Sequence, residues 1–287
     1  MNWKTSFAGI IVTILVSAVC AQAAGTENLD DSKRLVLVEL YTSQGCDMCP
    51  AAEKLLGMMA ERDARIVPIA FHVDYFNSPW KDVFSDHLYS QRQMNYNELY
   101  TKPKNPEYGL YYTPMLMIDG QQSISGRDAA AAQAAIRQAM GRKPAVSLDI
   151  KLDQKSNGLA GTAEIKVTSR SAQAEKTPLL VCAVLREDKV VTAIASGENA
   201  GKSLVARFPA RQTKYDFIEL DGKSTAIQRF TFAIDPGWNQ QKLRLAVFVQ
   251  NKQTGAVYQA ADLPWQSDRP VGTAAKSTAA KSVGPRE

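Results

Sequence analysis

The hydrophobic pattern of the first half of the chain alternates between buried strands and amphipathic helices. Residues 35–41 form a continuous apolar run rich in β-branched side chains, which is typical of a strand buried on both faces. A helical pattern follows residue 50, with the apolar side formed by Leu55, Leu56, Met58 and Met59. The opposite, solvent-facing side is assigned to Glu53, Lys54, Glu61 and Arg62. A second strand is expected at residues 66–73.

The pattern then predicts a helical insertion followed by a hairpin and a closing helix. Residues 80–100 are aromatic-rich and mainly helical in pattern. A short apolar strand at 115–118 precedes Asp119-Gly120, a strong hairpin signal, and 121–125 would be the return strand. Asp128 is expected to cap an alanine-rich helix over 129–140. The predicted order is strand, helix, strand, insertion, strand, strand, helix.

From residue 145 onwards the periodicity changes to short alternating runs separated by turn residues. Such runs occur at 146–152, 163–167, 179–185, 230–234 and 243–249. They predict an antiparallel β domain, most simply a sandwich. We therefore expect one domain at 33–142, a second at 145–265, and a disordered tail at 266–287, which lacks an apolar period.

The N-terminal segment has the pattern of a secretory signal. Lys4 precedes a continuous run of apolar or small residues at 7–19, and Ala21-Gln22-Ala23 supplies small residues where a signal peptidase cuts. An uncleaved anchor is the alternative, but 13 residues of helix span only about 20 Å of a roughly 30 Å hydrocarbon core. We expect cleavage after Ala23, which leaves the mature chain exported, periplasmic or secreted, and without a stable membrane span.

Composition and charge exclude several classes of protein. The chain is 45% hydrophobic and 22% charged, which excludes wholly disordered, collagen-like and disulfide-dense chains. Its net charge is +5, but residues 1–23 carry one lysine, and the tail carries four basic and two acidic residues. The folded domains are thus close to neutral, and nucleic-acid binding has no support.

The chemistry of the chain centres on Cys46 and Cys49, which form a C-x-x-C pair where a strand ends and a helix begins. Unpaired N–H groups and the helix dipole favour a thiolate there, so Cys46 is the expected nucleophile. Cys49 would resolve a mixed disulfide. The alternatives are a structural disulfide and half of a zinc site, although the chain has no second pair to complete one. Cys182 lies in an apolar run and is expected to be buried and inert.

This arrangement resembles the thioredoxin-like superfamily, whose pattern is strand, C-x-x-C at a helix start, strand, proline-led hairpin and closing helix. The resemblance implies an α/β thioredoxin-like domain with a helical insertion, followed by the antiparallel β-sandwich-like domain. It also implies that Pro114 is a cis-proline facing the cysteine pair, and that Thr113 before it helps to bind substrate main chain.

The chain resembles more closely the secreted domain-of-unknown-function family 1223. The resemblance is carried by residues 38–50, 72–75, 80–82, 92–93, 112–114 and 197–203, and so covers about 35–265. Members usually have two small residues between the cysteines and a second proline after the first. This chain has Asp47-Met48 and Ala51 at those positions.

Other polar residues are weaker candidates. Glu39 interrupts an apolar strand and is either a proton acceptor for Cys49 or a hydrogen-bonded structural residue. His72 and Asp74 would share a strand face, where they orient a proton, bind metal or fix the following loop. Residues 197–203 imitate a phosphate-binding loop, but the glycine spacing is one residue short, so a structured turn between the domains is expected instead.

The sequence therefore favours an exported thiol–disulfide oxidoreductase with Cys46, Cys49, Pro114, Thr113 and Glu39 in its site and no cofactor. Its partners would be a thiol or disulfide substrate, either a protein or a small molecule, and a separate redox partner. The rival hypotheses are a Cu(I) carrier that binds through Cys46, Cys49 and His72, and a partner-binding protein without turnover.

Overall fold

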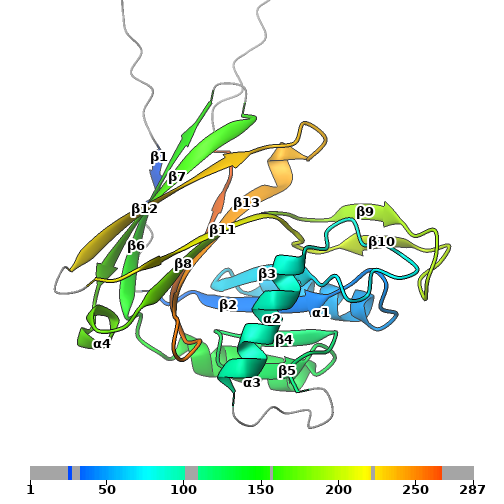
Figure 1. Cartoon of the computed structure of the whole chain (residues 1–287), viewed down its shortest axis with the longest axis horizontal. Coiled ribbons are helices and arrows are strands. Elements are labelled where there is room, and N and C mark those ends of the chain that lie inside the picture. Colours follow the sequence, from blue (N-terminus) through cyan, green and yellow to red (C-terminus); the bar gives the residue numbers. More distant parts are fainter. Residues whose placement is uncertain (1–24, 28–32, 101–108, 156–157, 221–223, 267–287) are drawn as a thin grey trace, which may run out of the picture.

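The computed structural model describes residues 25–27, 33–100, 109–155, 158–220 and 224–266 (Figure 1). The predicted signal at 1–23 and the predicted tail, apart from residue 266, lie outside these ranges. Four α-helices are described, namely α1 (Cys49–Arg62), α2 (His87–Leu99), α3 (Ala129–Met140) and α4 (Ala172–Glu175), with a 3-10 turn η1 (Gln240–Lys242). The described strands are β1 (Gly25–Glu27), β2 (Val36–Thr42), β3 (Ile66–His72), β4 (Met115–Ile118), β5 (Gln122–Ser125), β6 (Val146–Gln154), β7 (Ala160–Ser169), β8 (Leu179–Glu187), β9 (Val190–Ala193), β10 (Ser203–Ala206), β11 (Ala210–Ile218), β12 (Thr225–Ala233), β13 (Leu243–Asn251) and β14 (Val257–Pro264).

These strands form three four-stranded sheets and one separate hairpin. The mixed sheet has the order β3-β2-β4-β5, in which only the β2–β3 pairing is parallel. The central sheet (β11-β8-β13-β14) and the outer sheet (β1-β6-β7-β12) are antiparallel throughout. β9 and β10 pair only with each other, and they extend beyond the central sheet between β8 and β11.

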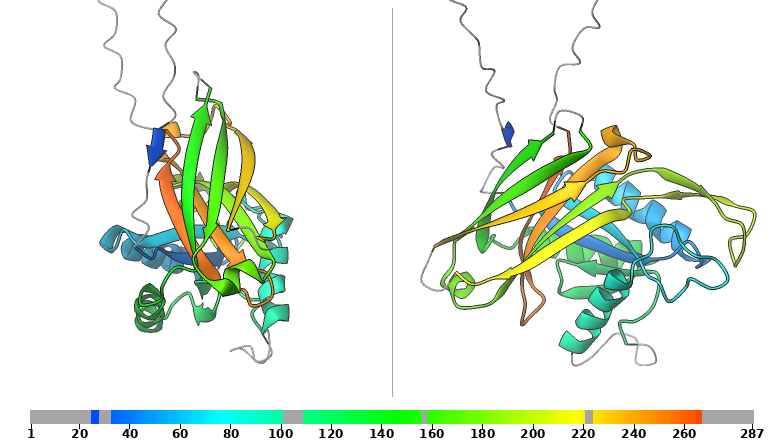
Figure 2. Two further views of the ribbon diagram at one scale, coloured as in Figure 1. Left: turned by 90° about the vertical axis from the view of Figure 1, so that its left-hand side faces the viewer. Right: turned by 45° about the horizontal axis from the view of Figure 1, so that its top comes forward.

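The sheets and helices are stacked in layers (Figures 1 and 2). Helices α1 and α3 cover one face of the mixed sheet, where their side chains join Val36, Val38 and Leu40 in one apolar cluster. The other face, with Leu37 and Tyr41, packs against the central sheet, and α2 packs into the side of this interface. The central sheet meets the outer sheet through a further cluster on its opposite face. The central sheet is therefore buried on both faces.

The predicted fold class, an α/β thioredoxin-like domain followed by a β-sandwich-like domain, is wrong. The protein is mostly β, with 43% of the described residues in strands and 21% in helices, and its sheets are mainly antiparallel. An α/β layer has parallel strands with helices on both faces. Here one pairing is parallel, and a second sheet covers the face where helices were expected.

The predicted positions of individual helices and strands agree with the structure better than the predicted fold class does. Helix α3 has the predicted bounds, and Asp128 caps it by accepting a hydrogen bond from Ala131 N–H. The insertion is helical only from His87 to Leu99. Strands β9, β10 and β11 were not expected, because their exposed faces interrupt the apolar pattern. Strand β14 was also not expected, because Gln259 and Asp262 interrupt its apolar run although most of the strand is buried.

A buried ion pair joins the mixed and central sheets. Glu39 is fully buried and points into their interface, where Arg92 Nε donates to its Oε1 at 2.6 Å and Tyr96 donates to its Oε2 at 2.6 Å. Arg92 also donates to Gln250 on β13. The Arg92 guanidinium lies over the Phe248 ring, 4.8 Å from its centroid. This cluster links α2, the mixed sheet and the central sheet through a single guanidinium.

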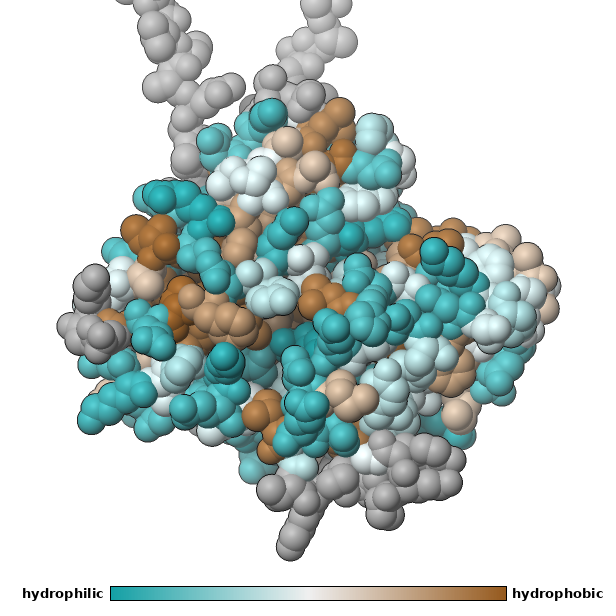
Figure 3. All heavy atoms as spheres, in the orientation of Figure 1, coloured by the Kyte–Doolittle hydropathy of each residue, from teal (hydrophilic) through white to brown (hydrophobic). Residues whose placement is uncertain are grey.

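The outside of the molecule is mixed in character. On the face shown in Figure 3, brown apolar side chains form small patches separated by teal hydrophilic ones. Exposed apolar residues include Val191 and Val205 on the β9–β10 hairpin and Phe217 on β11. Among the helices that the structure describes, none combines the length and apolar character needed to cross a membrane.

Replacing Arg92 by methionine should destabilise the protein strongly, because it leaves the Glu39 carboxylate buried without its partner. Breaking such a pair costs about 3–5 kcal/mol in free energy of unfolding. The control is Arg229→Met, which removes the exposed pair with Glu164 and should cost no more than about 1 kcal/mol. Urea unfolding of both variants measures the difference, and equal costs would contradict this role for Arg92.

Candidate functional site

The cysteine pair lies in the loop between β2 and α1, at the carboxyl end of β2. Two successive turns form this loop, since Cys46 N–H donates to Ser43 C=O and Cys49 N–H donates to Cys46 C=O. Helix α1 then begins at Cys49 without a side-chain cap, and Pro50 occupies its first turn, where a missing N–H has no cost. The loop therefore sets Cys46 just ahead of the helix and Cys49 within it.

Cys46 and Cys49 form a disulfide with a Cα–Cα distance of 5.4 Å. Cys46 is 2% exposed and Cys49 is 0% exposed, whereas Asp47 and Met48 between them are exposed. Asp47 and Met48 point to solvent, so the two sulfurs are buried by other parts of the chain.

The cap loop, residues 194–202, joins β9 to β10 and binds the main chain around Cys46. The Asn199 side chain is fully buried and donates to the main-chain oxygens of Gln44 and Cys46, at 2.9 Å and 3.0 Å. Glu198 accepts a hydrogen bond from Asp47 N–H at 3.0 Å. The cap loop is thus attached to the backbone on both sides of the Cys46 sulfur.

The glycines of the cap loop have a structural explanation. Gly197 and Gly201 have φ angles of 83° and 78°, a region that glycine adopts without strain. They form a tight turn, in which Ala200 N–H donates to Gly197 C=O, and this agrees with the structured turn expected from the sequence. The turn also reaches the 78–80 segment, since Ser196 Oγ donates to Pro79 C=O.

Arg207 holds the base of the β9–β10 hairpin against α1. Its backbone N–H donates to Glu53 Oε2 at 2.9 Å, and its guanidinium pairs with Glu61 of α1 and with Asp188 next to β9. Helix α1 therefore carries the disulfide at its start and the attachment point of the hairpin on its later turns.

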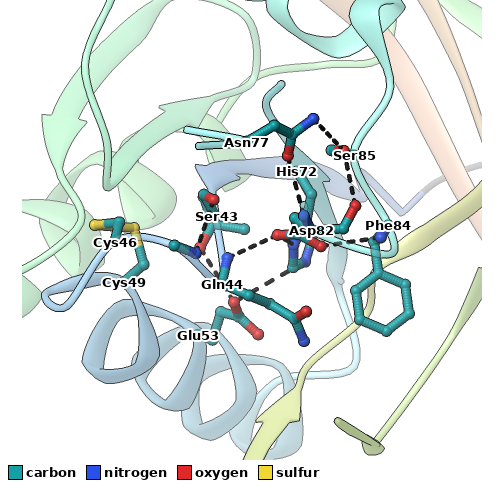
Figure 4. A network of polar contacts seen from close by, with 12 residues as sticks. Ser43, Gln44, Cys46, Cys49, Glu53, His72, Asn77, Asp82, Phe84 and Ser85 are labelled. Atoms are coloured by element: carbon teal, nitrogen blue, oxygen red, sulfur yellow. Dashed lines mark hydrogen bonds and ion pairs between the residues drawn. A yellow bond between two sulfur atoms is a disulfide. The ribbon is translucent and has the colours of Figure 1, made fainter. Parts of the chain in front are cut away.

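A buried polar network lies behind the disulfide (Figure 4). His72, at the end of β3, is fully buried, and its Nδ1 lies 2.7 Å from Asp82 Oδ2. The same Asp82 oxygen accepts a hydrogen bond from Gln44 N–H. On the other side of the ring, His72 Nε2 lies 3.9 Å from Glu53 Oε1, which accepts a hydrogen bond from Thr42 Oγ1.

The three ionisable groups of this network have shifted pKa values. Burial raises the pKa of the Glu53 carboxyl, and the nearby His72 offsets this only in part. Burial is the largest effect on His72 and lowers its pKa, but the Asp82 and Glu53 carboxylates outweigh it, so that the pKa is raised. Burial raises the pKa of Asp82, but its interactions with His72 and two backbone N–H groups outweigh this and lower it. The network favours a charged His72–Asp82 pair beside a proton-binding Glu53.

The family of the chain follows from a comparison with known proteins. Residues 37–250 match the model of a family described as a protein of unknown function (DUF1223), and the match includes both cysteines, the network and the cap loop. The chain belongs to the DUF1223 family. No curated protein sequence matches it.

Two solved structures share the fold of this DUF1223 chain at low sequence identity. A crystal structure of a protein from Agrobacterium tumefaciens has a TM-score of 0.59 and 18% identity, covering 82% of this chain and 96% of that one. HBP35 of Porphyromonas gingivalis has a TM-score of 0.64 and 15% identity, covering 88% of this chain and 81% of that one.

Pro114 lies next to the first turn of α1. Its peptide bond with Thr113 is cis, as the resemblance implies, and Thr113 is buried. A Cβ built on Gly126 would lie 2.7 Å from Pro114 Cβ and 3.0 Å from Ala52 Cβ, so Gly126 permits the close approach between the proline and α1. A second cis bond, Ser78–Pro79, lies in the segment that the cap loop contacts.

Glu39 and Asp74 are not brought together with the cysteines. Glu39 points to the face of β2 opposite α1 and is held by Arg92, so its position gives no basis for proton transfer to Cys49. Asp74 lies beyond the end of β3 and bonds to Ser90 and His87, whereas His72 bonds to Asp82. His72 and Asp74 thus belong to two separate networks.

The copper hypothesis required His72 beside the two sulfurs. The His72 ring instead lies between Asp82 and Glu53. Across the part of the chain that the structure describes, no group of three or more His, Cys, Asp or Glu side chains is arranged to hold a metal ion. Cys182 is buried at the interface of the mixed and central sheets, and burial raises the pKa of its thiol to about 12.

Sequence reasoning missed three residues of the site. Glu53 was assigned to the solvent side of its helix, yet it is 4% exposed. Its spacing of four from Cys49 places both on one helix face and could have indicated this. Asp82 and Asn199 lie in two of the segments that carry the family resemblance, but nothing local indicated their partners, which lie 10 and 153–155 positions away.

Replacing Asn199 by alanine should expose the disulfide. The variant loses two buried hydrogen bonds worth about 0.5–1.5 kcal/mol each, so opening of the cap loop becomes easier. We expect dithiothreitol to reduce Cys46–Cys49 roughly tenfold faster or more, because each 1.36 kcal/mol corresponds to about a factor of ten. Val205→Thr, on the exposed face of β10, is the control and should leave the rate unchanged. Equal rates in all three proteins would show that the cap loop does not control access.

The His72–Asp82 pair should make stability depend on pH. The folded-state pKa of His72 is raised above 6.5, so its contribution is complete below pH 6.5 and is lost as pH rises through the folded value. The folded-state pKa of Asp82 is lowered below 3.8, so its contribution is present above pH 3.8. Asp82→Asn should therefore cost about 3 kcal/mol at pH 5.5 and less at pH 9.

Urea unfolding at the two pH values tests this expectation. Asp63→Asn is the control, because it removes an exposed pair with Arg65 and should cost little at either pH. An Asp82→Asn cost that is the same at pH 5.5 and pH 9 would contradict a charged pair.

Proposed function

We propose that this DUF1223 protein is an exported thiol–disulfide oxidoreductase that acts through Cys46 and Cys49. The observation that carries the proposal is the disulfide between two cysteines three positions apart at the start of α1, backed by a buried network of ionisable side chains. A bond that only pins a loop needs no such network. The proposal rests on these residues and requires no kinship with the thioredoxin-like superfamily.

The different positions of the two sulfurs assign their roles. Cys46 lies outside the helix, beside exposed residues, and the cap loop binds its main-chain oxygen. Cys49 is inside the first turn of α1 and fully buried. Once the cap loop moves, a substrate reaches Cys46 first, so Cys46 is the attacking sulfur and Cys49 the resolving one.

The exchange proceeds in two balanced steps. The Cys46 thiolate attacks a substrate disulfide, a bond forms between Cys46 Sγ and one substrate sulfur, and the released substrate thiolate takes a proton from solvent. The Cys49 sulfur then attacks Cys46, which restores the protein disulfide and releases the second substrate sulfur. The substrate gains two electrons and the pair loses two, and the reverse sequence oxidises a substrate dithiol.

The start of α1 tunes the Cys46 thiolate in two opposing ways. The helix N-terminus stabilises negative charge in front of its first turn. The Glu198 carboxylate, held by Asp47 N–H, and the Asp47 side chain bring negative charge to the same region. The substrates we propose are protein or small thiols and disulfides, with a separate redox partner that resets the pair.

Single-cysteine variants test the proposal. Reduced Cys49→Ser keeps the attacking sulfur but cannot resolve, so it should accumulate a mixed disulfide when mixed with a disulfide-containing model peptide. Cys46→Ser should accumulate far less, because the remaining sulfur is fully buried. Intact-mass measurement after acid quenching gives both yields.

The reduction potential separates turnover from a structural bond. A structural disulfide typically has a potential below about −300 mV, and we expect a less negative value here. A value below that limit, together with no mixed disulfide in either variant, would contradict the proposal and favour a partner-binding protein without turnover.

A further inference from the structure

We propose that Glu53 accepts the proton of the Cys49 thiol when the disulfide closes and returns it when the disulfide opens, with His72 and Asp82 as positioning residues. The inference rests on the proposed function and adds to it the route of the proton. From the sequence, Glu39 was the expected proton acceptor and His72 with Asp74 a pair that could orient a proton, whereas Glu53 and Asp82 were not expected in these roles.

The geometry of α1 brings Glu53 to Cys49. The two residues are four positions apart, so their Cβ atoms lie about 5–6 Å from each other on one helix face. This face is the buried one, shared with Ala52 and Leu56. Figure 4 shows the Glu53 side chain rising from α1 on the His72 side of the disulfide, below Ser43 and Gln44. From this position a water molecule can relay a proton between the carboxyl and the Cys49 sulfur.

Burial creates the need for such a group. Cys49 is 0% exposed, so its proton cannot leave directly to bulk solvent when the sulfur must attack as a thiolate. The other ionisable side chains of α1 that the structure describes, Lys54, Glu61 and Arg62, are all exposed. Glu53 is the ionisable residue of this helix that faces inward with Cys49.

The surroundings of Glu53 suit a reversible proton acceptor. Thr42 Oγ1 and Arg207 N–H each donate to one of its oxygens, which fixes the carboxyl but leaves further acceptor positions free. Burial raises its pKa towards the range in which it can both bind and release a proton. A carboxyl in water would remain ionised and would bind the proton too weakly.

His72 holds the carboxyl from the inner side. Asp82 engages Nδ1, and the Phe84 ring lies 5.0 Å from the imidazole centroid, so the ring has one orientation. Its Nε2 therefore points towards Glu53 and is buried without a hydrogen-bond partner among the described residues. The charged imidazole stabilises the ionised form of Glu53, and this opposes the rise in the pKa of Glu53 that burial causes.

The proton step completes the exchange. In the mixed disulfide, the Cys49 S–H bond breaks, its proton forms an O–H bond with Glu53, and the electron pair stays on Cys49 Sγ. That sulfur attacks Cys46 Sγ, the Cys46–substrate bond breaks, and the substrate leaves with the two electrons. Opening of the disulfide by a substrate dithiol runs the same step in reverse.

Other charges around the network set its pH dependence. Asp82 faces His72 from the loop before α2, and Arg211 on β11 lowers the pKa of His72 by its positive charge. Arg211 is itself paired with Glu187. The Arg207 guanidinium is paired with Glu61 and Asp188, so its backbone rather than its charge acts on Glu53.

The experiment measures closure of the disulfide from the mixed disulfide with glutathione as a function of pH. Reduced protein is mixed with oxidised glutathione, quenched with acid, and the species are separated by intact mass. Glu53→Gln keeps the shape and the acceptor oxygen but cannot take a proton, so closure at pH 7 should slow by about 100-fold. The inflection that Glu53 gives the wild-type pH profile should also disappear.

The control is Glu164→Gln on the outer sheet, whose carboxylate pairs with the exposed Arg229, and it should leave the rate and the profile unchanged. Glu53→Asp should recover part of the rate, whereas a merely structural role would not distinguish it from glutamine in this way. His72→Gln removes the positive charge beside Glu53 and should shift the inflection to higher pH.

Each outcome decides between the claims. A folded Glu53→Gln variant with the wild-type closure rate and pH profile overturns the proton role. If that variant does not fold, an unshifted inflection in His72→Gln overturns it instead. If the wild-type protein forms no mixed disulfide with glutathione or the model peptide, the proposed function itself is overturned. If the wild-type protein exchanges normally and the variants keep its pH profile of closure, only the proton role of Glu53 is overturned.

Discussion

Strand β2 has apolar side chains on both of its faces, and the whole structure depends on covering them. Val36, Leu37, Val38, Leu40 and Tyr41 are all 0% exposed, although neighbouring residues of a strand point in opposite directions. Helices α1 and α3 cover one face, and the central sheet covers the other. The central sheet is itself apolar on its other face, and the outer sheet buries that face. The two apolar faces of β2 are thus covered by three layers, namely the helices, the central sheet and the outer sheet.

The layers on both faces of β2 contribute residues to the site at the carboxyl end of this strand. The helical layer supplies Cys49 and Glu53 through α1. The sheet cover supplies the cap loop, which extends from the β8–β11 strand pair across the layers (Figure 1). The main chain leaving β2 supplies Gln44 and Cys46, to which Asn199 binds. The disulfide therefore lies where the two covers meet.

The sequence predicted what short-range rules control, and it failed where a partner distant in the chain decides. The cysteine pair, the start of α1 and the bounds of α3 follow from capping, spacing and apolar periodicity. The buried position of Glu53 does not, because Arg207 and His72 hold it from other elements. Glu39 looked catalytic because it interrupts an apolar strand, but its partner Arg92 lies 53 positions later. The fold class was wrong for a related reason: the pattern marks a strand as doubly buried without showing whether helices or another sheet bury it.

The long separation between the cysteines and the cap loop has a consequence for how the protein matures. Hydrogen bonds from Asn199 reach residues 153 and 155 positions earlier in the chain. A chain that emerges N-terminus first therefore contains Cys46 and Cys49 well before the segment that binds around them is made. The two sulfurs are accessible in the incomplete chain and buried in the finished molecule. Formation of the disulfide and any reaction of the folded protein at it thus take place under different conditions of access.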